Sequence, residues 1–271
     1  MTITCLVENT SRNNFPCEHG LSLHLLLDDG RTLLFDMGQT ALFASNAEAM
    51  GISLKEVDFA VLSHGHYDHG GGLSTFLSLN QKSNVFVRED AFGAFYSKRA
   101  DGLAYIGLDC AFKENARIVF CEECMEVTPG AILFSGVCGA KCNPPGNRLL
   151  MGEGNLLDTF GHEQNLLIAE NAHLVLFAGC AHAGIVNILE KAVEVTGCVP
   201  SHVVAGMHLM KNGLSETDEN DFIVSLAKEL MHYRETTFYT LHCTGDEAYR
   251  KLKAQMNGQL HRLTSGGQLV L

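Results

Sequence analysis

Apolar and polar residues alternate along the chain in short blocks that predict a series of strands and helices. Residues 21–38 form two apolar runs around Asp29 and Gly30, a pattern typical of a β-hairpin. Residues 165–180 show the same pattern, with the turn near Asn171. The other blocks predict strands at 58–64, 84–90, 202–208, 237–243 and 268–271, and helices at 40–51, 72–79, 184–197, 216–234 and 246–257.

The order of these blocks favours mixed sheets covered by helices, because each half begins with a hairpin and continues with alternating strands and helices. Residues 61–77 and 176–192 each contain an apolar strand, a loop with histidine, a glycine and a helix. We interpret this similarity as two sheet-plus-helix units that face each other within a single domain over residues 1–271. The stretch 139–155 is rich in glycine and proline and is predicted to be a loop.

Composition narrows the class of protein. The chain has 271 residues, 46% of them hydrophobic and 18% charged, which is typical of a soluble globular protein. Its formal net charge of −12 argues against a generic nucleic-acid binder, which needs clustered basic residues. The sequence shows neither an apolar window long enough for a membrane span nor a secretory signal pattern. We therefore expect a cytoplasmic protein whose ten cysteines are reduced thiols.

Four side chains with metal-binding chemistry follow the apolar strand at 58–64. His64 and His66 are two residues apart and can point at one centre, while the adjacent Asp68 and His69 can reach a second. Imidazole nitrogen and carboxylate oxygen are the usual ligands of Zn²⁺ and of non-haem iron. Glycines at position 65 and at positions 70–72 allow the loop to fold tightly. The sequence therefore predicts a metal site at this strand end.

This H-x-H-x-D-H motif resembles that of the metallo-β-lactamase superfamily, and the resemblance extends over most of the chain. It implies an α/β (α+β) fold, a four-layer αββα sandwich of two mixed sheets. It implies that Asp36 in "LLFDMG" supports the histidine loop through hydrogen bonds. It also implies that His162 in "FGHEQNLLI" joins His64 and His66 on the first metal.

The fourth motif departs from the superfamily, which has "LFTGD" where this chain has "LFAGCAHAG". Cys180 occupies the position of the aspartate that bridges two metals. Because thiolate is a good zinc ligand, Cys180 is predicted either to bind metal or to pack as a buried thiol. His182 is the alternative nitrogen ligand at this point in the chain.

The fifth motif has two candidate histidines, each at a predicted strand end. We expect His242 in "TFYTLHC" to bind the second metal, and His208 in "VVAGMHLM" to line the pocket as an acid or an oxyanion donor. Arg148 is a candidate for binding a substrate anion. Together these motifs are similar to a subgroup of the superfamily that includes proteins described as dihydropterin ribofuranosyl-aminobenzene-phosphate synthase-like.

The expected function is a metal-dependent hydrolase that acts on a small-molecule ester, phosphoester or related substrate. One or two Zn²⁺ ions, or Fe or Mn in their place, would activate a water molecule that Asp68 orients. Two alternatives stay open at this point: a non-catalytic metabolite-binding sensor with the same fold, and a di-iron oxidoreductase. The expected partner is a small-molecule substrate.

Overall fold

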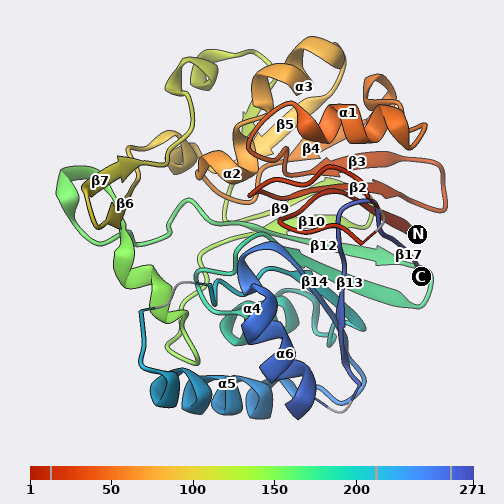
Figure 1. Ribbon diagram of the computed structural model, residues 1–271. Coiled ribbons are helices and arrows are strands. Elements are labelled where there is room, and N and C mark those ends of the chain that lie inside the picture. The colour runs from red at the N-terminus through yellow and green to blue at the C-terminus, as the bar shows by residue number, and fades with distance from the viewer. Residues whose placement is uncertain (13, 211–212, 257) are drawn as a thin grey trace. The chain divides into compact units, whose positions relative to one another are not determined.

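The computed structural model describes residues 1–12, 14–210, 213–256 and 258–271. The chain divides into two compact units, each with its own sheet and helices (Figure 1). Unit 1 contains Met1–Glu122, Met151–Gln164 and Leu263–Leu271, and unit 2 contains Glu123–Leu150 and Asn165–Arg262.

Unit 1 is built on a seven-stranded mixed sheet in the order β17-β1-β2-β3-β4-β5-β8. Strands β17, β1, β2 and β3 are antiparallel neighbours, and β3, β4, β5 and β8 run parallel. The predicted hairpin is confirmed as β2 and β3, and Gly30 has the positive φ of 89° that its turn requires. The strands are β1 (Thr2–Val7), β2 (Ser22–Leu26), β3 (Thr32–Phe35), β4 (Phe59–Val61), β5 (Asn84–Val87), β8 (Ile118–Phe120) and β17 (Gln268–Val270).

The helices of unit 1 bury one face of this sheet. Phe43 from α1 and Phe76 from α3 are fully buried in a cluster with Leu34 of β3 and Ala60 of β4. Figure 1 shows α1 and α3 together on the same side of β3 and β4. The remaining elements of unit 1 are α1 (Leu42–Ala49), α2 (Tyr67–Gly70), α3 (Leu73–Leu79), the hairpin β6 (Tyr96–Arg99) and β7 (Gly102–Tyr105), and the 3-10 helices η1 (Leu54–Glu56), η2 (Glu89–Phe92), η3 (Cys110–Glu114) and η5 (Glu153–Asn155).

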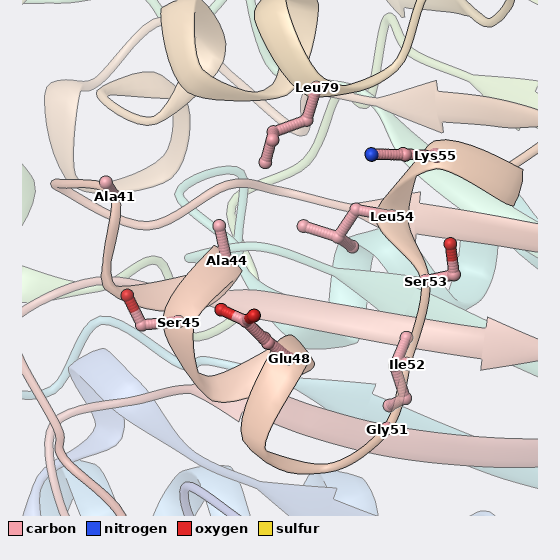
Figure 2. Close-up of a pocket in the computed structure, with 10 residues that line it drawn as sticks. All are labelled: Ala41, Ala44, Ser45, Glu48, Gly51, Ile52, Ser53, Leu54, Lys55 and Leu79. Carbon is pink, nitrogen blue, oxygen red and sulfur yellow. The ribbon is translucent and has the colours of Figure 1, made fainter.

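A cavity of about 620 Å³ lies beside α1 and η1 in unit 1 (Figure 2). Its lining includes Ala44 and Glu48 of α1, Leu54 and Lys55 of η1, and Leu79 at the end of α3. None of the metal-site residues expected from the sequence lines this cavity.

Unit 2 repeats the plan of unit 1, with the sheet order β16-β15-β14-β13-β12-β10-β9. Strands β9, β10, β12 and β13 are antiparallel neighbours, and β13 to β16 run parallel. The second predicted hairpin is confirmed as β12 and β13, with Asn171 at a φ of 52° in its turn. The strands are β9 (Cys124–Thr128), β10 (Ala131–Phe134), β12 (Asn165–Glu170), β13 (His173–Ala178), β14 (His202–Ala205), β15 (Thr237–Thr240) and β16 (Leu260–Arg262).

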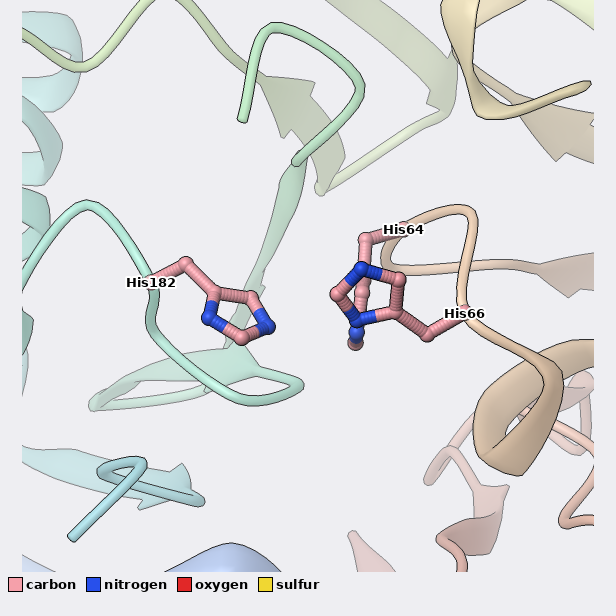
Figure 3. Close-up of side chains that lie close together, drawn as sticks. All are labelled: His64, His66 and His182. Carbon is pink, nitrogen blue, oxygen red and sulfur yellow. The ribbon is translucent and has the colours of Figure 1, made fainter. Parts of the chain in front are cut away.

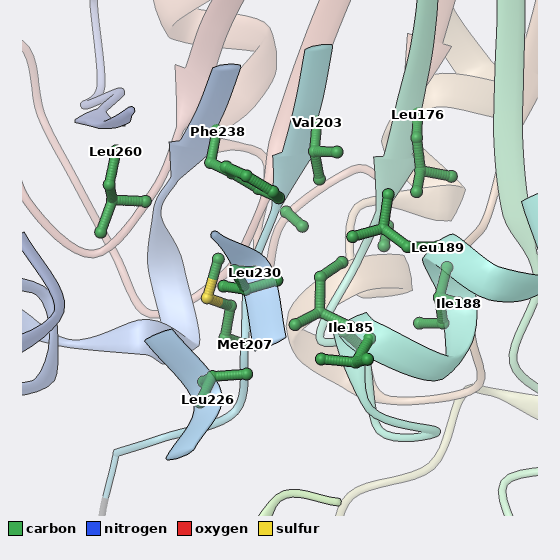
Figure 4. Close-up of a cluster of buried hydrophobic side chains, with 14 of the residues drawn as sticks. Leu176, Ile185, Ile188, Leu189, Val203, Met207, Leu226, Leu230, Phe238 and Leu260 are labelled. Atoms are coloured by element: carbon green, nitrogen blue, oxygen red, sulfur yellow. The ribbon is translucent and has the colours of Figure 1, made fainter. Parts of the chain in front are cut away.

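Three helices bury one face of the second sheet (Figure 4). Leu189 of α4 and Leu230 of α5 are fully buried with Leu176, Val203 and Phe238 of the strands. Each such aliphatic side chain contributes about 1.5–3 kcal/mol when it is removed from water. The elements are α4 (Ile185–Thr196), α5 (Glu216–Leu230), α6 (Asp246–Gln255), η4 (Pro145–Leu149) and η6 (His242–Thr244). Along the chain, unit 2 ends and unit 1 resumes within β11 (Leu150–Met151).

The structure differs from the expected elements mainly at their ends. The helix expected over 216–234 stops at Leu230, and the one expected over 246–257 stops at Gln255; residue 257 lies outside the described residues. Strands β1, β9, β11 and β16 and the β6–β7 hairpin were absent from the expected elements. No helix among the described residues is both long and apolar enough to cross a membrane.

Candidate metal centre

Four non-glycine residues at the ends of parallel strands have left-handed backbone conformations. Asp36 follows β3 with a φ of 60°, Ala181 follows β13 at 52°, His208 follows β14 at 48° and His242 follows β15 at 51°. Such a conformation costs free energy for a residue with a Cβ, and it is concentrated in proteins at functional sites. In both units these positions coincide with the motifs that carry the expected metal ligands.

The histidine loop of unit 1 follows β4 and leads into α2, a single helical turn. His64, His66, Asp68 and His69 are all buried. The ring of His64 lies 4.6 Å from that of His66 and 4.1 Å from that of His69, measured between centroids. A Cβ at Gly65 would come within 2.3 Å of the carbonyl oxygen of Ala91, so the loop can pack here only with glycine.

Asp36 lies fully buried beneath this loop and accepts three hydrogen bonds. Its Oδ1 accepts from the backbone N–H of Ser63 at 2.7 Å, and its Oδ2 accepts from the Ser63 hydroxyl at 2.7 Å. The same Oδ2 is 2.6 Å from Nδ1 of His69. Asp36 therefore makes the contacts with the histidine loop that the resemblance implies, and its role at a bound metal stays a prediction.

These bonds fix the protonation pattern of two histidines. Because a carboxylate can only accept, Nδ1 of His69 carries a proton, so in the neutral imidazole the lone pair is on Nε2. The Ser63 hydroxyl gives its single proton to Asp36, so it accepts from Nδ1 of His64 at 2.9 Å. His64 therefore also has its lone pair on Nε2. One buried carboxylate thus sets both imidazoles in the tautomer that binds a metal through Nε2.

His66 lies beside a second buried carboxylate. Its Nε2 is 3.7 Å from Oδ2 of Asp158, and burial lowers the pKa of His66 from 6.5 to about 4 despite the opposing influence of Asp158. Burial raises the pKa of Asp158, but its contacts with His162 and His66 outweigh that effect and hold the pKa well below its ordinary range. His66 is therefore neutral at physiological pH, as a metal ligand must be.

His162 is held by two hydrogen bonds within unit 1. Its Nδ1 accepts from the backbone N–H of Gly65 at 2.9 Å, because that N–H can only donate. Its Nε2 then carries the proton and donates to Oδ2 of Asp158 at 3.1 Å. Both ring nitrogens are engaged by the protein, so metal ligation by His162 would require one of these bonds to break. The ligand role implied by the resemblance stays a prediction.

Asp68 has a neighbour that the motif does not include. Nε2 of His19 lies 3.1 Å from Oδ2 of Asp68, and about half of the His19 side chain is exposed. The backbone carbonyl of Asp68 accepts from the N–H of Leu21 at 3.0 Å, which ties α2 to the start of β2. The segment before β2 thus holds Asp68 through both its side chain and its backbone.

In unit 2, His182 is oriented by the glycine- and proline-rich loop predicted at 139–155. The side-chain amide nitrogen of Asn147 donates to the carbonyl oxygen of His182 at 2.7 Å, which fixes the orientation of that amide. The side-chain oxygen Oδ1 of Asn147 then accepts a hydrogen bond from Nδ1 of His182 at 3.0 Å. The lone pair of His182 is therefore on Nε2, as in His64 and His69. Figure 3 shows His64 and His66 on the loop after β4, and His182 on the loop after β13.

Two cysteines and a histidine gather beside His182. One ligand atom from each of Cys180, His208 and Cys243 lies within 4.8 Å of the others. The ring of His208 is 4.4 Å from that of His182, and a Cβ at Gly146 would come within 3.1 Å of the His208 ring. Burial raises the pKa of the Cys243 thiol, but its contacts with Cys180 and His208 outweigh burial and hold the pKa well below the ordinary value.

The two remaining expected residues of unit 2 lie in different surroundings. His242 is buried in η6, directly after β15 and next to Cys243. Arg148 is exposed on η4, and its guanidinium donates to the carbonyl oxygen of Gly213 at 2.5 Å. Anion binding by Arg148 stays a prediction.

The donors of unit 1 fit a transition metal. His64 and His69 have Nε2 lone pairs, His66 is neutral, and Asp68 supplies a carboxylate, a set that suits Zn²⁺ or non-haem iron. Five further residues of the two units were missed from the sequence. Of these, only Ser63, which directly precedes the motif, carried a local signal. The others are His19, Asn147, Asp158 and Cys243.

Comparison with known proteins gives consistent matches. The model of the metallo-beta-lactamase superfamily matches residues 22–165. The chain is 26% identical to a 7,8-dihydropterin-6-methyl-4-(beta-D-ribofuranosyl)-aminobenzene-5'-phosphate synthase of Methanocaldococcus jannaschii, over 97% of this chain and 94% of that protein. It is 32% identical to Tm1679, described as a metal-dependent hydrolase of the beta-lactamase superfamily, with a TM-score of 0.82 over 100% and 99% of the two chains. Zn²⁺-bound PqqB from Methylobacterium extorquens shares the fold at 13% identity, with a TM-score of 0.58 over 100% of both chains.

Proposed function

The chain belongs to the metallo-beta-lactamase superfamily, and from this premise we propose that it is a metal-dependent hydrolase of a small-molecule ester, phosphoester or related substrate. The observation that carries the proposal is the buried network in which Asp36 and Ser63 fix the protonation of His64 and His69. A purely structural loop has no need to present imidazole lone pairs at a strand end. The likeness to Tm1679 supports the same reading.

The proposed ligands in unit 1 are His64, His66, Asp68 and His69. In unit 2 they are His182, His242 and, in place of the usual aspartate, Cys180; His162 is a ligand only if it leaves Gly65 or Asp158. We expect one or two Zn²⁺ ions, with Fe or Mn as alternatives. A bound ion of this kind lowers the pKa of a coordinated water toward 7 and stabilises negative charge on a reacting oxygen.

The side chains around the ligands have separate tasks. Asp68 has carboxylate oxygens that can accept a proton from a nucleophilic water and orient it, and His19 lies within hydrogen-bonding distance of Oδ2. Asp36 and Asn147 hold the imidazoles of His69 and His182 in place through hydrogen bonds. His208 was expected to line the pocket as an acid or an oxyanion donor, but its two thiol neighbours, Cys180 and Cys243, favour a different role.

A hydrolysis screen with counted metal tests this proposal. We would compare wild type with His64→Ala and with the matched variant His173→Ala, which changes a half-buried histidine at the start of β13. Each protein is loaded with Zn²⁺, Mn²⁺ or Fe²⁺, its metal content is measured by mass spectrometry, and it is assayed on bis(p-nitrophenyl) phosphate and on lactones. We expect turnover in wild type and His173→Ala. In His64→Ala we expect turnover to fall by more than about 10–100-fold, which is the loss typical when a residue that only hydrogen-bonds to a metal ligand is replaced. If the fully metal-loaded wild-type protein turned over none of these substrates, the proposal that it is a hydrolase would be overturned.

The M. jannaschii relative favours a second candidate function, a synthase. Its name describes a product that joins a dihydropterin to a ribofuranosyl-aminobenzene phosphate. The corresponding test incubates the metal-loaded protein with the ribofuranosyl-aminobenzene phosphate and with a dihydropterin that carries a leaving group, such as diphosphate, on its 6-methylene carbon. As the new bond to that carbon forms, the bond to the leaving group breaks, so mass spectrometry searches for both the coupled product and the released group. Coupling without hydrolysis would favour the synthase, and hydrolysis without coupling would favour the first proposal.

A further inference from the structure

Unit 2 contains a group of metal-binding side chains whose chemistry differs from that of the histidine loop. One ligand atom from each of Cys180, His208 and Cys243 lies within 4.8 Å of the other two. Both cysteines are buried, with 2% and 4% of their surface exposed, and His208 is half-buried. We propose that these three residues bind a soft or borderline metal ion, such as Zn²⁺, through two thiolates and one imidazole.

The backbone brings the three side chains together from three successive parallel strands. Cys180 follows β13, His208 follows β14 and Cys243 follows β15, so all three lie at the carboxyl edge of one sheet. His208 adopts a left-handed φ of 48°. This conformation costs free energy in a non-glycine residue, and such strain is concentrated at sites where the side chain must point in one direction.

Close packing around Cys243 is a second, independent sign of a built site. The backbone N–H of His208 donates to Sγ of Cys243 at 3.2 Å, so the sulfur already acts as an acceptor. A Cβ at Gly206 would come within 2.6 Å of the same sulfur. Position 206 therefore needs glycine for Cys243 to lie where it does. An N–H that points at sulfur stabilises thiolate over thiol, as in metal–thiolate sites.

The ligand set indicates which metals the site would prefer. Two thiolates and an imidazole form a three-ligand zinc set of the kind that leaves a fourth position for water or substrate. Thiolates favour Zn²⁺ over the hard ions Mg²⁺ and Ca²⁺. Each thiol releases its proton when it binds, so binding should weaken as the pH falls.

This inference deepens the proposed function only at Cys180, which it pairs with Cys243, and it gives His208 a ligand role in place of proton donation. It does not require the protein to hydrolyse anything. Its test therefore uses a spectroscopic signal that does not depend on turnover.

Cobalt substitution tests the site directly. Reduced protein is loaded with Co²⁺, and the near-ultraviolet charge-transfer absorption between thiolate and cobalt is recorded. The variants are Cys243→Ser, the matched control Cys198→Ser at an exposed cysteine of unit 2, and His64→Ala. We expect the band in wild type, Cys198→Ser and His64→Ala, and its loss in Cys243→Ser together with one equivalent of metal. Retention of both the band and the metal in Cys243→Ser would overturn the assignment.

X-ray absorption of the wild type keeps the test decisive if Cys243→Ser does not fold. Zinc bound by this group should show sulfur neighbours at about 2.3 Å. A metal-loaded wild type with only nitrogen and oxygen neighbours would overturn the proposal. Because this result is independent of the hydrolysis screen, failure of the soft site and failure of the hydrolase can be told apart.

Discussion

Oδ2 of Asp36 lies 2.6 Å from Nδ1 of His69, and neither side chain is exposed to solvent. This short, charge-assisted contact fixes the proton of His69 on Nδ1. Ser63 extends the same control to His64 through its hydroxyl. A single carboxylate at the end of β3 therefore determines how two imidazoles of the next strand's loop present their lone pairs.

Replacement of Asp36 by asparagine should damage both metal binding and folding stability. The amide offers one acceptor where the carboxylate offers two, so at least one of its partners, Ser63 or His69, is left buried without its bond. We expect metal affinity to fall by about 10–100-fold and the free energy of unfolding by about 1–3 kcal/mol. Isothermal titration with Zn²⁺ and urea unfolding measure the two effects. Asp29→Asn, in the exposed β2–β3 turn, is the matched control, and equal behaviour of the two variants would refute a special role for Asp36.

His162→Gln separates a ligand from a positioning residue. The hydrogen bonds to Gly65 and Asp158 favour positioning, so the variant should still bind the full complement of metal at saturation, with weakened affinity. His64→Ala should not reach that complement at any metal concentration. Metal counting after gel filtration measures the difference. A His162→Gln protein that stays one equivalent short would instead support the ligand role implied by the superfamily resemblance.

Asn147→Ala should release His182 from its fixed orientation. The variant removes the acceptor of the Nδ1 proton and the donor to the His182 carbonyl. We expect a loss of metal affinity of about 10–100-fold with little change in the melting temperature, because Asn147 lies on a half-buried surface loop. Asn143→Ala in the same loop is the control, since its side chain bonds to Gly139 and Asn187 instead of His182. Unchanged metal affinity in Asn147→Ala would contradict this account of His182.

The stability of unit 1 should depend on pH through His24, which is buried on β2. Burial lowers the pKa of His24 from 6.5 to about 4. Below pH 6.5 the unfolded chain binds a proton that the folded chain takes up only near pH 4, so the stability from neutral His24 is present above pH 6.5 and lost toward pH 4. Between pH 7 and pH 5, wild type should lose about 2 kcal/mol relative to His24→Gln.

Urea unfolding of both proteins at the two pH values measures this difference. Other groups that titrate in the same pH range change the free energy of unfolding equally in wild type and His24→Gln, so their contribution cancels in the difference. His232→Gln, which changes an exposed histidine just after α5, should behave like wild type. A constant difference between wild type and His24→Gln from pH 7 to pH 5 would show that His24 does not resist protonation in the folded state.

Much of the fold could be predicted because its signals are local. The hairpins at Gly30 and Asn171 and the stop of α4 at Gly197 depend on residues that accept a positive φ, and the sequence shows them directly. Strand β1 was missed because it is defined by partners at opposite ends of the chain, β2 and β17. Helix α5 ends before its predicted limit, because the apolar spacing continues into residues that form turns.

The candidate site likewise contains residues that local motifs predict and residues that only the fold brings together. The histidine loop and Asp36 belong to compact motifs, so their residue types could be read from the sequence. The partnership of His162 with Gly65 joins residues 97 positions apart, and that of Asn147 with His182 joins residues 35 positions apart. Nothing in the local pattern marks such pairs, since only the folded backbone brings the donors and acceptors into contact. Cys243 was missed for the same reason.

Anomalous diffraction at the absorption edge of the bound metal tests the central claim most directly. Crystals of wild-type protein are measured as purified and after soaking with Zn²⁺, Mn²⁺ and Fe²⁺. We predict an anomalous peak at about 2.0–2.1 Å from Nε2 of His64, with the contact between Asp36 and His69 intact. Maps from every crystal without a peak at His64, His66 or His69 would contradict it.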